Sequence, residues 1–325
     1  MSDEKVLLDV DHLKTWFPVG GGMFRKAAGY VHAVEDVSFQ IHEQETFSLV
    51  GESGCGKSTT GQSILRLVEP TGGDVRFDGE SLLALNKEEM RKARRNMQMV
   101  FQNPYASLNP RMTLQKLLEE PLVTHFQLSR QELADRVREM AEAVGFSPEQ
   151  LSRYPHQFSG GQRQRICIAR AIITKPRFIV ADEPVSALDV SIQAQILNLL
   201  MKLQEDMKLT YLFISHDLNV VRHISNRTAI MYLGHILETG DTDKVYHKPL
   251  HPYTQALLSA IPRTDPSEHH HRILIDGDVP NAAEPPKGCV FHGRCPHCME
   301  ICRETAPEQV EAEPGHWVSC HLIKR

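Results

Sequence analysis

A glycine-rich segment near the N-terminus has the residue types and spacing of a phosphate-binding loop. It reads G-E-S-G-C-G-K-S from Gly51 to Ser58, after a short, mostly apolar run from Thr46 to Val50 and before a predicted helix. This is the context in which the pattern G-x-x-x-x-G-K-[ST] forms a P-loop. The glycines let backbone N–H groups turn toward an anion, and the helix N-terminus adds partial positive charge. Lys57 would reach the β- and γ-phosphates of a nucleotide, and Ser58 would bind Mg²⁺.

Two carboxylates follow an apolar run farther along the chain. Phe178 to Ala181 predicts a buried strand, and Asp182 and Glu183 come directly after it. Ligands bind at the carboxyl ends of strands in open α/β sheets. Asp182 is therefore expected to hold Mg²⁺, and Glu183 to polarise the attacking water as a general base.

A second candidate anion site opens another helix. Phe158 is followed by Ser159-Gly160-Gly161-Gln162, and then by a clear helical pattern. Small residues at a helix N-terminus expose backbone N–H groups to an anion. One chain rarely needs two γ-phosphate sites, but two copies that face head to tail would each complete the other's nucleotide site.

With these motifs in order, the sequence resembles the ATP-binding cassette (ABC) family over about residues 5 to 262. The resemblance also rests on F-Q-N-P around Gln102, S-A-L-D ending at Asp189, and I-S-H-D around His216. It implies ATP and Mg²⁺ as cofactors, with Glu183, His216 and Gln102 as catalytic residues and Ser58, Gln102 and Asp182 at the metal. Asp189 is implied to couple two cassettes, and Tyr30 is a candidate for stacking on adenine, with strand packing as the alternative. The implied nucleotide contacts are Gly51, Ser53, Gly54, Cys55, Gly56, Lys57, Ser58, Thr59, Gln102, Asp182, Tyr30 and, on the opposite cassette, Ser159, Gly161 and Gln162.

The C-terminal part narrows the resemblance to ATPases of oligopeptide and dipeptide importers. The run from Leu250 to Leu258, the G-D-V-P at Gly277 and the P-P-K-G-C ending at Cys289 are similar to that group. The implied partners are two transmembrane permeases, a second ABC ATPase such as a paralogue, and an extracytoplasmic substrate-binding protein. The chain would then sit at the cytoplasmic face of the inner membrane. Importers of nickel, glutathione or antimicrobial peptides are the alternatives, and a soluble ATPase that remodels nucleic acid or ribosomes is the rival class.

Five of the seven cysteines crowd near the C-terminus. In a cytosolic chain such a cluster favours a metal over disulfides. In the importers that this chain resembles, the extension resembles a [4Fe–4S] module, whose cysteine pattern maps to Cys289, Cys295, Cys302 and Cys320. Zinc, with Cys298 as an alternative ligand, and the absence of a metal remain open. His292, His297, His316 and His321 are further candidate ligands. The run His269 to His271 could also bind metal, although a solvated linker is the simpler interpretation.

Length and composition set the frame for these sites. The chain has 325 residues, 41% hydrophobic and 24% charged, with a net charge of −5. These values exclude a disordered chain and give no sign of a nucleic-acid partner. We expect no membrane span and no export signal. The predicted fold is α/β: a P-loop NTPase cassette with a RecA-like core and a helical subdomain at about 103–157 within residues 1–262, plus a small Cys-rich extension over 263–325.

Overall fold

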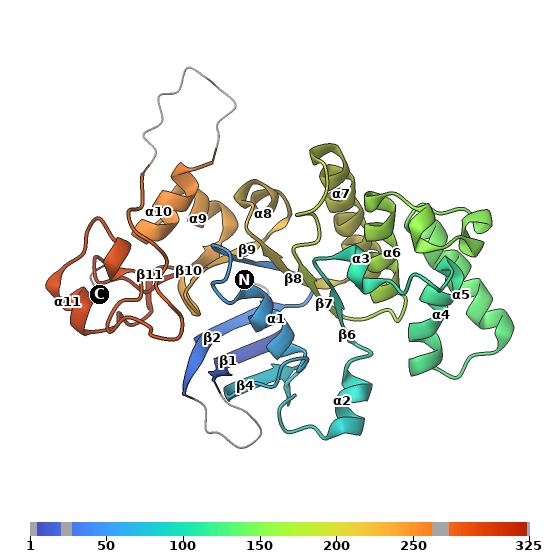
Figure 1. The fold of residues 1–325 in the computed structure, drawn as a ribbon, viewed down its shortest axis with the longest axis horizontal. Helices are drawn as coiled ribbons and strands as arrows, with labels where there is room; N and C mark the ends of the chain where they lie inside the picture. The colour runs from blue at the N-terminus through green and yellow to red at the C-terminus, as the bar shows by residue number, and fades with distance from the viewer. Residues whose placement is uncertain (1–4, 21–27, 262–272, 324–325) are drawn as a thin grey trace. The chain divides into compact units, whose positions relative to one another are not determined.

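A computed structural model describes residues 5–20, 28–261 and 273–323 of the chain. The chain divides into two compact units, one made of Met1–Leu83 with Ser215–Arg325 and the other of Ala84–Ile214. We call these the first and the second unit; Figure 1 follows them along the chain by colour. The predicted helical subdomain lies inside the second unit. Both the boundary at residue 262 and the run His269 to His271 fall outside the described residues.

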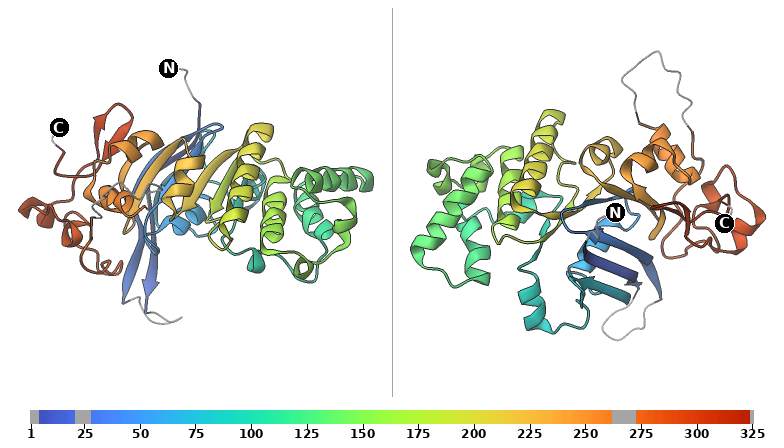
Figure 2. Two further views of the ribbon diagram at one scale, coloured as in Figure 1. Left: turned by 90° about the horizontal axis from the view of Figure 1, so that it is seen from above. Right: turned by 180° about the vertical axis from the view of Figure 1, so that it is seen from behind.

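The first unit contains an antiparallel sheet in the order β2-β1-β4-β5. Its strands are β1 (Val6–Val19), β2 (Gly29–His42), β4 (Gly72–Phe77) and β5 (Glu80–Ser81). Apolar and polar residues alternate along β1 and β2, so that one face is buried and the other meets solvent. Figure 2 shows β1 and β2 as a long two-stranded ribbon.

Strands of a second sheet in the first unit run in the order β11-β12-β10-β9-β3. They are β3 (Thr46–Val50), β9 (Arg227–Tyr232), β10 (His235–Asp241), β11 (Val310–Glu313) and β12 (His316–Val318). β3 is buried at every position and pairs in parallel with β9. The strand predicted at Thr46 to Val50 is confirmed, and it leads directly into α1 (Lys57–Ile64) through the glycine-rich loop.

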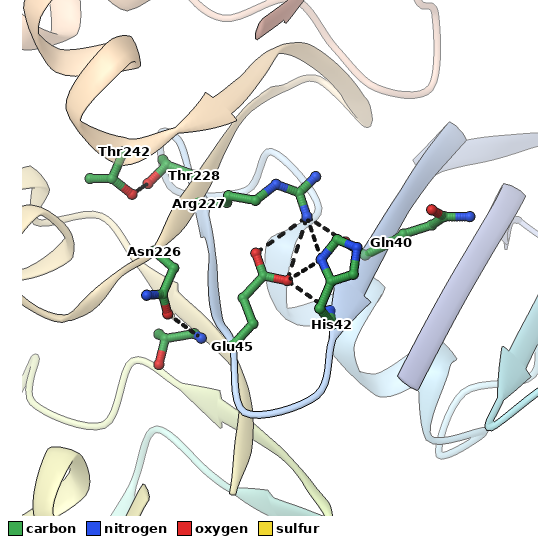
Figure 3. A network of polar contacts seen from close by, with 8 residues as sticks. Gln40, His42, Glu45, Asn226, Arg227, Thr228 and Thr242 are labelled. Atoms are coloured by element: carbon green, nitrogen blue, oxygen red, sulfur yellow. Dashed lines mark hydrogen bonds and ion pairs between the residues drawn. The ribbon is translucent and has the colours of Figure 1, made fainter. Parts of the chain in front are cut away.

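A polar network fixes the start of β3 (Figure 3). The Glu45 carboxylate accepts hydrogen bonds from the His42 backbone N–H at 2.7 Å and from Arg227 Nη1 at 3.2 Å. Beside it, the Thr46 N–H donates to Asn226 Oδ1 at 2.8 Å, and the Asn226 N–H returns a bond to the Thr46 carbonyl at 2.9 Å. The turn before β3 is therefore tied to the start of β9 by both charge and backbone.

Residues after β10 complete the first unit, and Figure 1 draws them in orange and red. Strand β12 pairs with β10, so the end of the chain adds two strands to the sheet. The His316 ring at its start contacts Glu238 of β10 at 2.8 Å, and both side chains are fully buried. The helical segments after β10 are α9 (Thr242–His247), α10 (Pro252–Ser259), the 3₁₀ turn η3 (His292–Arg294) and α11 (Glu300–Glu304), and α8 (Leu218–Ile224) precedes β9 in the same unit.

The second unit combines three parallel strands with helices. The strands β6 (Met97–Val100), β7 (Phe178–Asp182) and β8 (Thr210–Ser215) lie in the order β8-β7-β6, with β7 and β8 buried throughout. Capping boxes begin α5 at Ser129 and α6 at Ser159. The helices are α2 (Lys87–Ala93), α3 (Pro104–Ser107), α4 (Leu114–His125), α5 (Arg130–Ala143), α6 (Gly160–Ile172) and α7 (Val190–Met207), with 3₁₀ turns η1 (Pro148–Ser152) and η2 (Pro155–Gln157).

The central helices of the second unit bury apolar side chains on one face. Leu114, Leu117 and Leu118 are buried on α4, as are Val137 and Met140 on α5. The α4 helix packs against α5 and α6. Among the residues described, no helix is both long enough and apolar enough to cross a membrane.

The Figure 3 network predicts that Glu45→Gln lowers the free energy of unfolding by about 1–3 kcal/mol, because it removes a charged acceptor and leaves Arg227 without its counter-charge. The matched control is Arg138→Gln, which breaks an ion pair whose two side chains are each 53% exposed. Its expected cost is below about 0.5 kcal/mol. Urea unfolding of the full chain measures both; equal shifts would contradict the assignment.

Candidate functional site

The glycine-rich loop approaches two neighbouring strands more closely than any side chain would permit. A Cβ on Gly51 would lie 2.1 Å from the Met231 carbonyl oxygen of β9, and one on Gly56 would lie 2.1 Å from the Ala33 carbonyl oxygen of β2. Gly56 also has φ 107°, a left-handed conformation that favours glycine. These glycines, expected to expose backbone N–H groups to an anion, are therefore also required by packing.

Lys57 is a buried side chain turned back onto its own loop. Its Nζ donates to the Gly51 carbonyl at 2.8 Å and to the Glu52 carbonyl at 2.9 Å, with only 5% of the residue exposed. Ser53 and Gly54 at the tip of the loop are exposed, whereas Ser58 and Thr59 lie half-buried in the first turn of α1. Burial raises the pKa of the Cys55 thiol, against the effect of nearby Lys57, so Cys55 is a packed neutral residue. The loop therefore carries one cation and open backbone at its tip, which suits an anion.

Tyr30, the candidate for stacking on adenine, lies beside a second aromatic side chain, Trp16. Tyr30 is 47% exposed on β2, and its ring lies 6.2 Å from that of Trp16 on β1. The Trp16 ring stacks on His32 at 4.4 Å, and its Nε1 donates to Glu35 at 2.7 Å. The same stretch of β2 carries Ala33, which contacts the P-loop at Gly56. Sequence reasoning missed Trp16, because cross-strand pairing, rather than spacing, brings it next to these rings.

In the second unit, the carboxyl end of β7 presents Asp182 and Glu183, as predicted. Asp182 is buried at 4% exposure, and Glu183 is half-buried with φ 44°. Its N–H donates to the Ile214 carbonyl at 2.9 Å, which holds this uncommon backbone conformation in place. The structure also brings Gln102 to this acid: Gln102 Nε2 donates to Glu183 Oε2 at 2.8 Å.

The predicted second anion site is the N-terminus of α6. Ser159 is exposed, and its Oγ accepts from the Gln162 N–H at 3.3 Å while the Gln162 side chain accepts from the Ser159 N–H at 3.0 Å. A Cβ on Gly161 would lie 2.5 Å from Ile192 of α7, so this glycine allows close packing of the two helices. Ser159 and Gln162 are thus brought together at the helix end by the capping box.

Two further predicted residues lie at element ends. Asp189 is exposed at the N-cap of α7, next to Val190, which is 81% exposed. His216 belongs to the first unit and is exposed just after β8. Next to it, Asp217 caps α8 through its Oδ1, which accepts from the Asn219 N–H at 2.8 Å.

The C-terminal cysteines are all free thiols. The Cys289 N–H donates to the Cys302 carbonyl at 2.8 Å. Burial, and beyond it the neighbouring Cys302, Cys320 and Cys295, raises the pKa of Cys289 to about 11. No three His, Cys, Asp or Glu side chains within the described parts of the chain form a group that could hold a metal ion. The predicted iron–sulfur or zinc site is therefore not supported by the structure.

Several candidate histidine ligands in this region contact protein atoms instead. Nδ1 of His292 contacts the Cys289 carbonyl at 2.8 Å, and Nε2 of His321 contacts the Thr305 carbonyl at 2.9 Å. His316 is the buried partner of Glu238. These contacts explain why histidine spacing alone was a poor guide to ligands.

Comparisons with known proteins found similar families, sequences and solved structures. Residues 34–186 match the family described as "ABC transporter", and residues 237–302 match "Oligopeptide/dipeptide transporter, C-terminal region". The chain is 52% identical to the oligopeptide transport ATP-binding protein AppF of Bacillus subtilis over 99% of this chain and 98% of AppF. It is 50% identical to the oligopeptide transport ATP-binding protein OppF of Salmonella typhimurium over 98% and 97%. Among solved structures, the ATP-binding cassette MJ0796, a dimer in a post-hydrolysis state with ADP and Pi, is 30% identical with a TM-score of 0.64, covering 73% of this chain and 99% of that one.

Gly56→Ala should destabilise the first unit by roughly 3 kcal/mol or more, because the added methyl group overlaps the Ala33 carbonyl and the backbone is left-handed. The control is Gly79→Ala, which has φ +83° but nothing within 4 Å of its Cβ. We expect that change to cost about 1 kcal/mol, the backbone term alone. Thermal unfolding of the two variants gives the comparison, and similar losses would refute the packing role of Gly56.

Proposed function

The chain belongs to the ABC transporter family, as an ATPase related over its full length to oligopeptide transport ATP-binding proteins, and from this we propose that it powers the import of peptides. The observation that carries the proposal is the full-length similarity together with the match of residues 237–302 to the C-terminal region of oligopeptide/dipeptide transporters. The names of these relatives, which are oligopeptide and di/tripeptide transport ATP-binding proteins, favour peptides over nickel or glutathione as cargo.

We propose that ATP binds at the P-loop, with Lys57 on the β- and γ-phosphates and backbone N–H groups around them. Ser58 and Asp182, with Gln102, would hold Mg²⁺, an ion that favours oxygen ligands. The support is the chemistry of these residues: a buried lysine at the start of α1, and a buried carboxylate at the end of β7. The exposed ring of Tyr30, beside the half-buried Trp16, is proposed to receive adenine on the same unit as the P-loop.

Glu183 is proposed as the general base that polarises the attacking water. Its support is the hydrogen bond from Gln102 Nε2, which fixes one carboxylate oxygen and orients the other. His216 is proposed to contact the γ-phosphate, and Asp189 to couple two cassettes; both are exposed at element ends.

We propose that two cassettes pair head to tail, so that the N-terminus of α6 in one meets ATP held by the other. A 13-residue helix whose N-terminus carries the exposed Ser159 can place its partial positive charge against phosphate. The second cassette would be a paralogue or another copy of this chain. ATP-driven closure of the pair would then switch the permeases between two states.

The remaining partners follow from the same family. Two transmembrane permeases and an extracytoplasmic substrate-binding protein are proposed, with this chain at the cytoplasmic membrane face. Tyr105, which follows Gln102 closely and is 62% exposed, is available to a permease, whereas Leu108 is 3% exposed and belongs to the core.

A metal group on Cys289, Cys295, Cys302 and Cys320 is a separate proposal. In its favour, the Cys289 thiol is close enough to the other three for them to raise its pKa, and thiolates are the ligands of iron–sulfur clusters and zinc. Against it, the described side chains do not stand in ligand positions. Binding would require these four side chains to rearrange, and the group would then cross-link the loops that carry them.

Glu183→Gln should reduce ATP turnover of the assembled transporter to less than about a tenth of wild type while ATP stays bound, because the amide cannot accept a proton from water. The control is Glu205→Gln, an exposed acid on α7. Steady-state phosphate release and retained radiolabelled ATP report the two effects. Turnover above that level would exclude Glu183 as the base.

For the cysteines, anaerobic purification should yield a brown protein with iron and sulfide in the preparation if the group is an iron–sulfur cluster. Cys302→Ser should lose colour and metal, whereas Cys298→Ser should keep both. Metal analysis decides between iron and zinc. A colourless, metal-free wild-type protein from anaerobic preparations would rule the group out.

A further inference from the structure

Glu52, the second residue of the P-loop, is held by all three of its polar groups. Its carbonyl accepts from Lys57 Nζ at 2.9 Å, and its N–H donates to Tyr253 Oη of α10 at 3.1 Å. Its carboxylate accepts from Arg294, with Nη1 at 2.9 Å from Oε2 and Nη2 at 3.4 Å from Oε1. Arg294 is 242 positions away in the sequence, at the end of η3. The C-terminal part of the chain thus contacts the nucleotide loop directly.

Arg294 is built into the first unit and is not a mobile surface cation. Its side chain is 10% exposed, and Nη1 also lies 3.4 Å from Tyr232 Oη. The rings of Tyr232, Tyr253 and Phe291 pack around this point with centroids 4.9 to 5.3 Å apart. A two-pronged arginine–carboxylate contact in such surroundings is stronger and better defined than an exposed pair.

Arg294 compensates the negative charge of Glu52, which would otherwise repel a triphosphate. A carboxylate within a loop that receives a triphosphate repels the ligand, and at partly buried sites such repulsion is weakly screened. Arg294 supplies the compensating charge in a fixed position. The attraction between Lys57 and phosphate is then not offset by the charge of Glu52.

We propose that Arg294 is a positioning residue of the nucleotide site: by neutralising and holding Glu52, the C-terminal extension sets the affinity of the P-loop for ATP. The proposal rests on the proposed function, because it requires ATP to bind at this loop. It extends the site to a residue that lies immediately before Cys295.

The charge argument predicts that only loss of Arg294, and not loss of the Glu52 charge, weakens ATP binding. Arg294→Gln should raise the dissociation constant of MgATP about three- to tenfold, the size of coupling seen between contacting charges. Glu52→Gln should leave it unchanged or lower it, since Arg294 then faces the phosphates without a competing acid. The double variant should return to within about twofold of wild type. Arg294→Lys, which keeps the charge, should retain most of the affinity.

The experiment is titration of the purified full-length chain with a fluorescent ATP analogue, displaced by MgATP, with unfolding temperatures measured in parallel. Lys248→Gln is the matched control: it breaks another ion pair of the first unit, with Glu313, and should not change affinity. A purely structural ion pair would make both single variants weaker binders, and that result would overturn the proposal, as would an unchanged affinity in Arg294→Gln.

Lys57→Ala separates this failure from failure of the proposed function. If wild type binds the analogue and Lys57→Ala does not, ATP binding at the P-loop stands, and the Glu52 and Arg294 variants test Arg294 alone. If wild type and Lys57→Ala bind alike, the nucleotide assignment itself is wrong. Should Arg294→Gln fail to fold, Glu52→Gln and Arg294→Lys still give the decisive signs.

Discussion

The P-loop depends on contacts between backbones that leave no room for side chains. Gly51 lies against the Met231 carbonyl and Gly56 against the Ala33 carbonyl, each at a distance that a Cβ would close to 2.1 Å. These contacts hold the loop between β2 and β9, and further backbone bonds extend the arrangement. The Gly234 N–H donates to the Cys55 carbonyl, and the Glu35 N–H donates to the Gly234 carbonyl. The loop is therefore shaped by the strands beside it before any ligand arrives, which lowers the entropy cost of binding.

Three buried or half-buried acids connect distant segments of the first unit in the same way. Each carboxylate accepts a hydrogen bond from an arginine or histidine side chain, and a backbone N–H group forms a further hydrogen bond at each acid. Glu45 joins the turn before β3 to Arg227, and Glu52 joins the P-loop to Arg294. Glu238 accepts from the Leu250 and His251 N–H groups at 2.8 and 2.9 Å and contacts His316. These contacts attach the C-terminal region to strand β10 through His316 and to the P-loop through Arg294.

The side chains proposed for the nucleotide site already have partners within the chain. Lys57 donates to two loop carbonyls, Ser159 and Gln162 cap one another, and Gln102 donates to Glu183. A nucleotide that binds here would replace such hydrogen bonds with its own. Its net affinity would then be the difference in free energy between two states that are both fully hydrogen-bonded. Burial adds to this order: it lowers the pKa of His251 to about 4, which keeps the ring neutral, and Nδ1 accepts from the Tyr253 N–H.

The candidate site residues could be located from the sequence, because short motifs encode local geometry. The loop Gly51 to Ser58, the Asp182–Glu183 pair at a strand end and the helix start at Ser159 were all recognisable from residue types and spacing. Which distant residues contact them became visible only in the folded chain. Trp16 is joined to Tyr30 by strand pairing, Gln102 to Glu183 by neighbouring strands, and Arg294 to Glu52 across most of the chain. Such contacts depend on which strands, turns and loops pack side by side, and the spacing of residues along the chain does not specify that packing.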